Sequence, residues 1–146
     1  RFARQELFGP LGMQHVSIEF DAAGNADGSS QMLASARDWA RFGQLYLDGG
    51  RYRGRQIVPE SWVRASTTPK AHVDDDVEYG YLWWLMTFPV GGETWSAFSM
   101  NGSGGNTVQV FPDRRAVVVI TTTNFDRPQP HAITRKLLVQ QILPRL

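Results

Sequence analysis

The chain has 146 residues with 15 basic and 14 acidic side chains, which leaves a formal net charge of +1. This length accommodates one domain with a hydrophobic core, and the balanced charge offers no basic field for nucleic acid. The absence of cysteine excludes disulfides and thiolate metal sites, and it fits either a cytoplasmic or a periplasmic protein. No apolar run approaches the roughly 20 residues that a membrane-spanning helix needs.

The N-terminal part predicts two helices joined by a polar segment. Phe2 to Phe8 is typical of the last turns of a helix that Gly9-Pro10 stops. Val16 to Phe20 alternates weakly, as a short strand does, and Asp21 to Ser30 has the composition of a loop. The second helix is expected from Ala36 to Leu47. Its apolar stripe consists of Trp39, Phe42, Leu45 and Tyr46.

The second helix has clear signals at both ends. Ser35 is expected to cap it, with Asp38 at the position of a capping-box acid, and Gly49-Gly50 is expected to end it. Arg51 to Gly54 reads as a polar turn. A short helix then begins at Pro59 and runs to Ser66, and its inward residues are expected to be Trp62 and Val63.

The C-terminal half predicts a meander of strands. Thr67 to Glu78 first reads as a loop, whose Asp74-Asp75-Asp76 is a solvated turn, with calcium binding as the alternative. The expected strands are Tyr81–Phe88, Thr94–Met100, Asn106–Phe111 and Ala116–Thr123. The β-branched run Val117 to Ile120 predicts that the last strand is covered on both faces. A final helix from Pro130 to Leu143 would pack on the sheet through Ile133, Leu137, Leu138, Gln141 and Ile142. Antiparallel strands with segregated helices define an α+β fold, an antiparallel sheet flanked by helices.

The most informative segment is the glycine-rich run from Met100 to Asp113. Gly102, Gly104 and Gly105 leave Ser103 almost alone as a side chain, which suits positive φ or a backbone that lies close to another group. Val108 and Val110 then alternate with Thr107, Gln109 and Phe111. The run is either an ordinary hairpin turn or a strand that ends in bare backbone beside a substrate cleft.

Five segments, in order, resemble the C-terminal part of the serine β-lactamase-like superfamily, which comprises class C β-lactamases, D-alanyl-D-alanine carboxypeptidases and related esterases and amide hydrolases. The segments are Glu6–Met13, Ala36–Gly50, Ile57–Trp62, Tyr79–Trp84 and Met100–Asp113. The resemblance implies a penicillin-binding protein-like fold and an acyl-enzyme mechanism. It also implies a bacterial-type hydrolase that needs no metal or cofactor.

The catalytic elements of that superfamily are missing from this sequence. Its members use Ser-x-x-Lys and then a Tyr-x-Asn or Tyr-x-Ser element. Lys70 and Lys136 follow Thr67 and Ile133 by three residues, so neither completes the first element. We therefore expect residues 1–146 to be a single partial domain, whose nucleophile lies in an upstream segment or on a second chain. A second chain would predict an exposed apolar sheet edge here.

The resemblance assigns the superfamily's third active-site motif to Met100-Asn101-Gly102. The Ser103 backbone N–H is then an oxyanion donor, while Met100, Asn101, Gly102 and Gly104 contact the acyl substrate. The superfamily has Lys or His where this chain has Met100, and a thioether carries no positive charge for a substrate carboxylate. This difference favours an esterase or amide hydrolase. The alternatives are that Met100 only fills the core and that the Ser103 hydroxyl only bonds its own turn.

Other candidate residues have simpler interpretations. His15, His72 and His131 are widely separated and accompany no Gly-x-Ser-x-Gly element, so packing or surface roles are expected. Trp83, Trp84 and Trp95 could line a pocket but are expected in the core. The competing interpretation of the whole chain is a non-catalytic binding or structural module with the same fold. Neither interpretation needs nucleic acid or a membrane as a partner.

Overall fold

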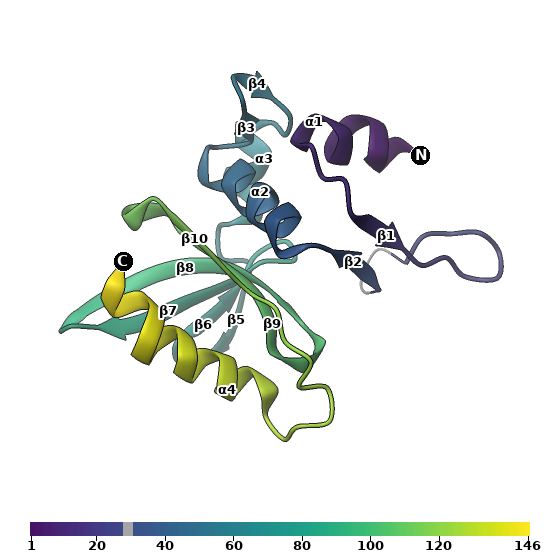
Figure 1. The fold of residues 1–146 in the computed structure, drawn as a ribbon. Coiled ribbons are helices and arrows are strands. Elements are labelled where there is room, and N and C mark those ends of the chain that lie inside the picture. Colours follow the sequence, from purple (N-terminus) through teal and green to yellow (C-terminus); the bar gives the residue numbers. More distant parts are fainter. Residues whose placement is uncertain (28–30) are drawn as a thin grey trace.

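The computed structural model describes residues 1–27 and 31–146 of the chain. Its centre is an antiparallel sheet with the strand order β10-β9-β8-β7-β6-β5. The strands are β5 (Ala71–Asp74), β6 (Val77–Tyr79), β7 (Trp84–Val90), β8 (Glu93–Gly102), β9 (Asn106–Phe111) and β10 (Ala116–Ile120). Helices α2 (Ala36–Leu47) and α4 (Pro130–Leu137) lie on opposite faces of this sheet (Figure 1). The predicted α+β fold is therefore confirmed.

Smaller elements complete the chain. A π-helical turn (Arg4–Phe8) leads into α1 (Gly9–Leu11), and α3 (Glu60–Ser66) connects the N-terminal half to the sheet. Two short antiparallel pairs join β1 (Val16–Ile18) to β2 (Met32–Ala34) and β3 (Arg51–Tyr52) to β4 (Arg55–Gln56). In the described part of the chain, no helix is both long and apolar enough to cross a lipid bilayer.

Helix α2 packs against β9 and β10 because its sheet side carries a glycine. A Cβ atom on Gly43 would lie 2.6 Å from Cγ1 of Val117, so any larger residue would push the helix away. Leu45 and Tyr46 of the predicted stripe are buried, and Tyr46 joins a cluster with Val110. The other side of α2 holds the N-terminal elements, whose core includes Leu11 and Leu45.

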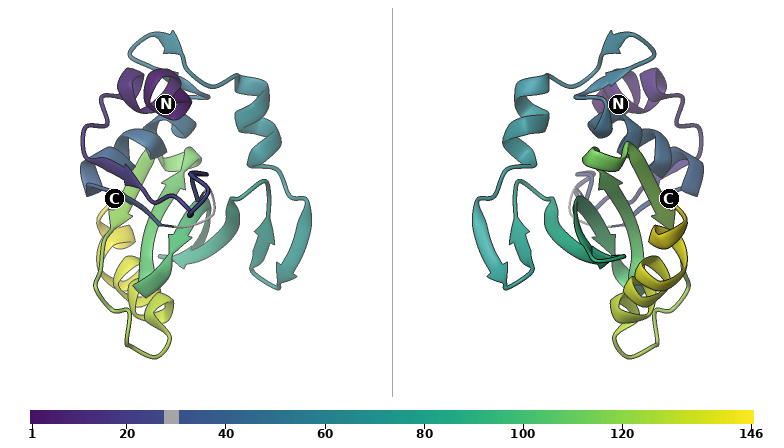
Figure 2. Two further views of the ribbon diagram at one scale, coloured as in Figure 1. Left: turned by 90° about the vertical axis from the view of Figure 1, so that its right-hand side faces the viewer. Right: turned by 90° about the vertical axis from the view of Figure 1, so that its left-hand side faces the viewer.

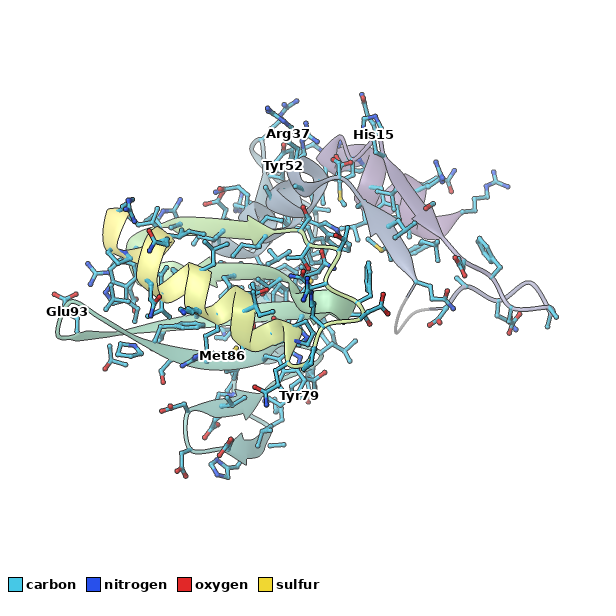
Figure 3. The ribbon with its side chains drawn as sticks, turned by 60° about the horizontal axis from the view of Figure 1, so that its bottom comes forward. His15, Arg37, Tyr52, Tyr79, Met86 and Glu93 are labelled. Carbon is cyan, nitrogen blue, oxygen red and sulfur yellow. The ribbon has the colours of Figure 1, made fainter. Side chains whose placement is uncertain are left out.

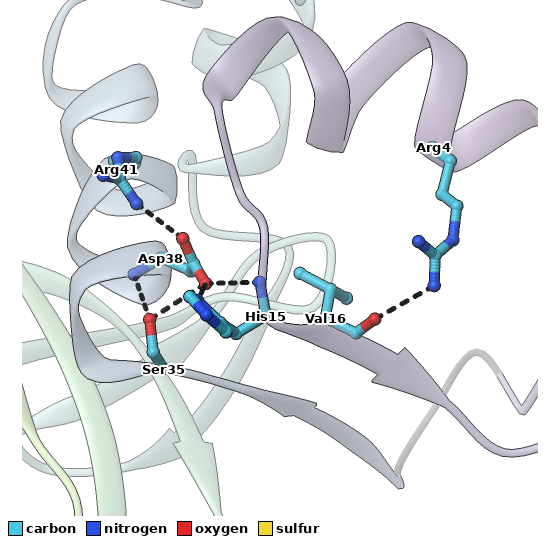
Figure 4. Close-up of polar contacts among 6 residues, drawn as sticks. All are labelled: Arg4, His15, Val16, Ser35, Asp38 and Arg41. Carbon is cyan, nitrogen blue, oxygen red and sulfur yellow. Dashed lines mark hydrogen bonds and ion pairs between the residues drawn. The ribbon is translucent and has the colours of Figure 1, made fainter.

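A buried carboxylate ties those N-terminal elements to α2 (Figure 4). Asp38 is fully inaccessible to solvent and accepts hydrogen bonds from Ser35 Oγ (2.9 Å) and the His15 backbone N–H (3.1 Å). Ser35 Oγ in turn accepts from the Asp38 N–H at 3.1 Å, so the predicted N-cap is confirmed. Arg41 Nη1 lies 2.6 Å from the second carboxylate oxygen. Burial would raise the pKa of Asp38, but these bonds and the Arg41 charge together hold it below its ordinary value.

Helix α4 and the turns that follow it cover the opposite face through only part of the predicted stripe, of which Leu138 and Ile142 pack against the core. Ile133 and Leu137 are 47% and 45% exposed, whereas Thr134, Leu138 and Leu143 are buried. The helix widens into a π-helical turn at Leu138–Ile142, which changes the periodicity that the prediction assumed. Leu138 and Leu143 pack with Phe88, Phe111 and Val118 in the core under this helix.

Several boundaries differ from the sequence predictions. The predicted loop Thr67 to Glu78 was wrong, because it contains the hairpin of β5 and β6, which stands at the outer edge of the molecule in Figure 2. All residues of β5 are exposed, so no alternating pattern marks it. Asp75 and Asp76 do lie in its turn. The expected loop Asp21 to Ser30 extends into residues 28–30, which lie outside the described part.

Two further corrections concern helices. Gly9-Pro10 does not stop the first helix, which continues to Leu11 and ends at Gly12 with a left-handed φ of 67°. Proline is tolerated there because it occupies the first turn of α1. Trp62 does not pack inward, since it is 49% exposed and stacks on Tyr81 with ring centroids 5.7 Å apart. Its neighbour Val63 is buried as expected.

Candidate functional site

The candidate site lies where strand β8 extends beyond the end of its neighbour β7. The pairing of β7 with β8 runs from Val90 opposite Glu93 to Trp84 opposite Ser99. On the other side of β8, pairing with β9 continues to Gly102 opposite Asn106. Among the described residues, Met100 to Gly102 therefore have a strand partner on one side alone. We call this stretch of β8 the open edge.

The open edge arises because the chain turns away just before β7. Leu82 has a left-handed φ of 64°, which interrupts an extended strand at that point. The Tyr81 N–H donates instead to the Ser66 carbonyl at 3.0 Å, at the end of α3. Gly80 permits this approach, because a Cβ atom there would lie 2.1 Å from the Ser66 oxygen. The predicted strand start at Tyr81 was wrong for this reason.

The three glycines of the turn have different environments. Gly104 and Gly105 are buried with positive φ, Gly104 against the Phe125 ring and Gly105 against Pro130 and Thr134 of α4. Both therefore shape the turn and its packing within this chain. Gly102 has an ordinary extended φ of −116°, and a Cβ there would meet its nearest neighbour at 3.5 Å. Neither the backbone conformation of Gly102 nor any neighbour among the described residues therefore requires a glycine at this position.

Ser103 begins the 3₁₀ turn that follows Gly102 and is exposed. Asn106 holds this turn, since its Nδ2 donates to the Ser103 carbonyl at 2.7 Å and the Thr122 carbonyl at 3.3 Å. The Asn106 side-chain oxygen accepts from the Thr122 N–H at 2.9 Å. The sequence analysis missed Asn106, although an asparagine after two glycines signals a turn held by its side chain.

Met100 and Asn101 project to opposite faces of the sheet. Met100 is half-buried beside the cluster of Trp83, Phe98 and Val110 on the α2 side. Asn101 is exposed on the α4 side, where its Oδ1 accepts from Thr107 Oγ1 at 2.8 Å. Neither side chain carries charge, so the site contributes no fixed cation to a bound molecule.

The other candidates do not gather at this site. His15 lies 3.7 Å from Asp38 and His72 lies 3.9 Å from Glu78, each as the exposed member of its pair. In Figure 3, His15 lies at the top of the molecule, far from Met86 and Tyr79 in the sheet. Trp83 and Trp95 are buried in the core, and Trp84 is half-buried. Within residues 1–27 and 31–146, no three metal-binding side chains come together.

Two surface hollows of the described chain lie elsewhere. One is lined mainly by residues of β6, β7 and β8 such as Glu78 and Met86, and another surrounds Asp48 and Arg115. Met100 to Gly104 border neither of them.

Comparisons with known proteins give one family match and several similar proteins. The model of the beta-lactamase family matches residues 1–142. An uncharacterised protein of Alkalihalophilus pseudofirmus is 27% identical over 107 residues, which make up 67% of this chain and 32% of that protein. Among solved structures, the "Putative 6-aminohexanoate-dimer hydrolase from Bacillus anthracis" superposes with a TM-score of 0.73 at 25% identity, over 92% of this chain and 35% of that one.

A more distant match shows the fold again. The octameric penicillin-binding protein homologue from Pyrococcus abyssi superposes with a TM-score of 0.62 at 19% identity, over 94% of this chain and 36% of that one. The chain thus spans about a third of the length of these relatives. From its match to the family model and its shared fold, the chain belongs to the beta-lactamase family of hydrolases.

Proposed function

We propose that this chain is the C-terminal segment of a β-lactamase-like serine hydrolase, in which it supplies the oxyanion strand and one wall of the substrate pocket. The observation that carries the proposal is the open edge of Met100 to Gly102, followed directly by the exposed Ser103. Backbone groups on the unpaired side of a strand are free to bind a substrate as an additional strand would.

The proposed reaction is acyl transfer through a covalent intermediate. A serine outside this chain attacks the substrate carbonyl and loses its proton to a base outside this chain. The base returns that proton to the leaving oxygen or nitrogen as the C–O or C–N bond breaks, so that a neutral alcohol or amine departs. Water then attacks the acyl-enzyme and releases the acid. In both steps the carbonyl oxygen gains negative charge, and in this proposal the Ser103 N–H donates a hydrogen bond to it. The nucleophilic serine's own N–H is the second donor in this proposal.

The uncharged site favours neutral acyl compounds. Met100 and Asn101 offer a thioether and a carboxamide where a cation would select a substrate carboxylate. We therefore propose an ester or amide as the substrate in preference to a β-lactam. The name of the Bacillus anthracis relative, a putative 6-aminohexanoate-dimer hydrolase, supports an amide as the bond that is cleaved, although 6-aminohexanoate itself carries a carboxylate.

The nucleophile must reach this site from an upstream segment or a second chain. The sheet has an edge suited to such a partner at β10, whose sequence Ala-Val-Val-Val-Ile is apolar throughout and whose register with β9 is unbroken. A non-catalytic module of the same fold is the second candidate. The observation that favours it is the absence of charge at Met100.

An activity assay separates the two functions. The 146-residue chain and the complete protein would each be given a chromogenic ester, a chromogenic amide and a chromogenic β-lactam. We expect the complete protein to hydrolyse the ester or amide, a serine-directed phosphonate to abolish that turnover, and the chain alone to be inactive. Absence of turnover in the complete protein, with no phosphonate labelling, would favour the non-catalytic module.

A further inference from the structure

A stripe of polar residues crosses the α4 side of the sheet beside the open edge. Ser99, Thr107 and Gln109 are buried there, with exposed fractions of 0%, 5% and 4%. They continue a face that is otherwise filled by Phe111 and Val118. Buried polar side chains in an apolar layer are costly unless they bond one another, so their arrangement needs an explanation.

Two hydrogen bonds of this stripe lead from Gln109 through Thr107 to Asn101. Gln109 Nε2 donates to Thr107 Oγ1 at 2.8 Å, and Thr107 Oγ1 donates to Asn101 Oδ1 at 2.8 Å. Thr107 lies directly across from Asn101 on β9, so the bond crosses one strand gap. The Asn101 oxygen is thereby occupied, and the opposite end of its carboxamide is directed away from β9.

The Asn101 amino group faces the side of β8 on which β7 has ended. Its nearest recorded partner there is the Met86 sulfur at 4.0 Å, which is a weak acceptor and also receives Ser99 Oγ–H at 3.4 Å. Figure 3 shows Met86 in the sheet, with Glu93 at the far tip of the β7–β8 hairpin. A stronger acceptor at the open edge could therefore replace this weak bond from Asn101 Nδ2 to Met86.

We propose that Thr107 and Gln109 are positioning residues, which fix the Asn101 carboxamide so that its Nδ2 donates to a neutral carbonyl oxygen of the substrate. This inference rests on the proposed function for its substrate, while the orientation of Asn101 follows from the contacts alone. Gln109 Oε1 is buried without a hydrogen-bond partner in the described residues. An apolar side chain at position 109 would fill the same space and would leave no buried acceptor without a partner. We therefore attribute the presence of Gln109 to its hydrogen bond to Thr107.

A double-mutant cycle in the complete hydrolase tests the proposal. Thr107→Val removes the hydroxyl and keeps the shape, Thr107→Ser keeps the hydroxyl, and Asn101→Ala removes the carboxamide. Because Asn101 would bind ground state and transition state alike, we expect Thr107→Val to raise KM for a chromogenic ester about fivefold to tenfold with kcat little changed. Thr107→Ser should retain the original KM. In the Asn101→Ala background, Thr107→Val should have no further effect on KM.

An equal rise in KM with and without Asn101 would overturn the inference, as would a loss confined to kcat. Melting temperatures of all variants show whether the fold is intact.

A second measurement needs no hydrolysis: the ¹⁵N order parameter of the Asn101 side-chain amide in the 146-residue chain. It should fall in Thr107→Val and stay high in Thr107→Ser, and an unchanged value in Thr107→Val would overturn the positioning role. Failure of the ester assay in the complete protein would instead count against the proposed function.

Discussion

At the scale of single residues, Gly102 and Gly105 differ in whether the fold itself requires a glycine. Gly105 must be glycine for the fold, because its φ is 86° and a Cβ would lie 2.6 Å from both the Pro130 oxygen and Thr134 Oγ1. Gly102 has ordinary backbone geometry and room for a methyl group. A glycine without a structural cause beside an open strand edge is consistent with close approach of a substrate.

The first prediction follows from this contrast. Gly105→Ala should destabilise the protein by about 2 kcal/mol or more, because it combines left-handed backbone with steric overlap. Gly102→Ala should leave the melting temperature unchanged and lower hydrolysis by the complete enzyme. Thermal unfolding and ester turnover of the two variants check this. A fall in melting temperature for Gly102→Ala as large as that for Gly105→Ala would show that both glycines serve the fold.

Asp38 gives a prediction on acid stability. The folded-state pKa of its carboxyl is lowered, so the unfolded chain binds the proton more readily. The Asp38 carboxylate therefore stabilises the folded protein fully above its unfolded-state pKa of about 3.9. This contribution is lost as the pH falls through the lower pKa of the folded state. Asp38→Asn should cost about 2–4 kcal/mol at pH 7, since a buried site loses its charged acceptor for His15, Ser35 and Arg41.

The measurement is urea unfolding of both proteins between pH 7 and pH 3. The difference in unfolding free energy should narrow as pH falls below about 4. Asp21→Asn is the control, because the pKa of Asp21 is also lowered, first by the Asn25 backbone N–H, yet Asp21 is exposed. A constant difference across the pH range would contradict the role of the Asp38 charge.

At the scale of elements, the sequence predicts those helices and strands whose boundaries are marked by neighbouring residues, such as turn residues or a helix cap. Strand β9 was predicted with its observed bounds, because alternation and the flanking turn residues define it. The cap of α2 was predicted from Ser35 for the same reason. The hairpin of β5 and β6 was missed because an exposed outer strand needs no apolar face. The inward face of α4 was predicted only in part, because a π-helical turn changes the periodicity and leaves Ile133 and Leu137 exposed.

The site itself was only partly predictable. The glycine-rich turn and Ser103 are visible in the sequence, but the open edge depends on where β7 begins. That boundary is set by the left-handed Leu82 and by the contact of Tyr81 with Ser66, neither of which has a sequence signature. The bond between Thr107 and Asn101 likewise depends on the register of β8 with β9.

At the scale of the whole molecule, the two outer strands of the sheet differ. β5 is short and carries the charged Asp74, with a register shift between His72 and Asp74, and these features discourage pairing with another chain. β10 is apolar and regular, and helices cover both of its faces, as is typical of a strand inside a sheet. This asymmetry supports a partner segment beside β10.

Hydrogen exchange checks the partner segment. In the complete protein, the outward-facing amides of β10 should be protected, while those of β5 exchange rapidly and serve as the internal reference. In the 146-residue chain both sets should exchange rapidly. Equal exchange at β10 and β5 in the complete protein would contradict a strand partner, and protection that grows with concentration of the 146-residue chain would identify a second copy instead.

The most direct test of the central claim compares two substitutions at Ser103 in the complete hydrolase. Proline fits the first position of the 3₁₀ turn but removes the backbone N–H, whereas alanine keeps it. If the Ser103 N–H stabilises the oxyanion, Ser103→Pro should lower kcat/KM for the ester by about 10²–10³ at unchanged melting temperature, and Ser103→Ala should retain full activity. Full activity in folded Ser103→Pro, or an equal loss in Ser103→Ala, would contradict the assignment of this strand to the oxyanion.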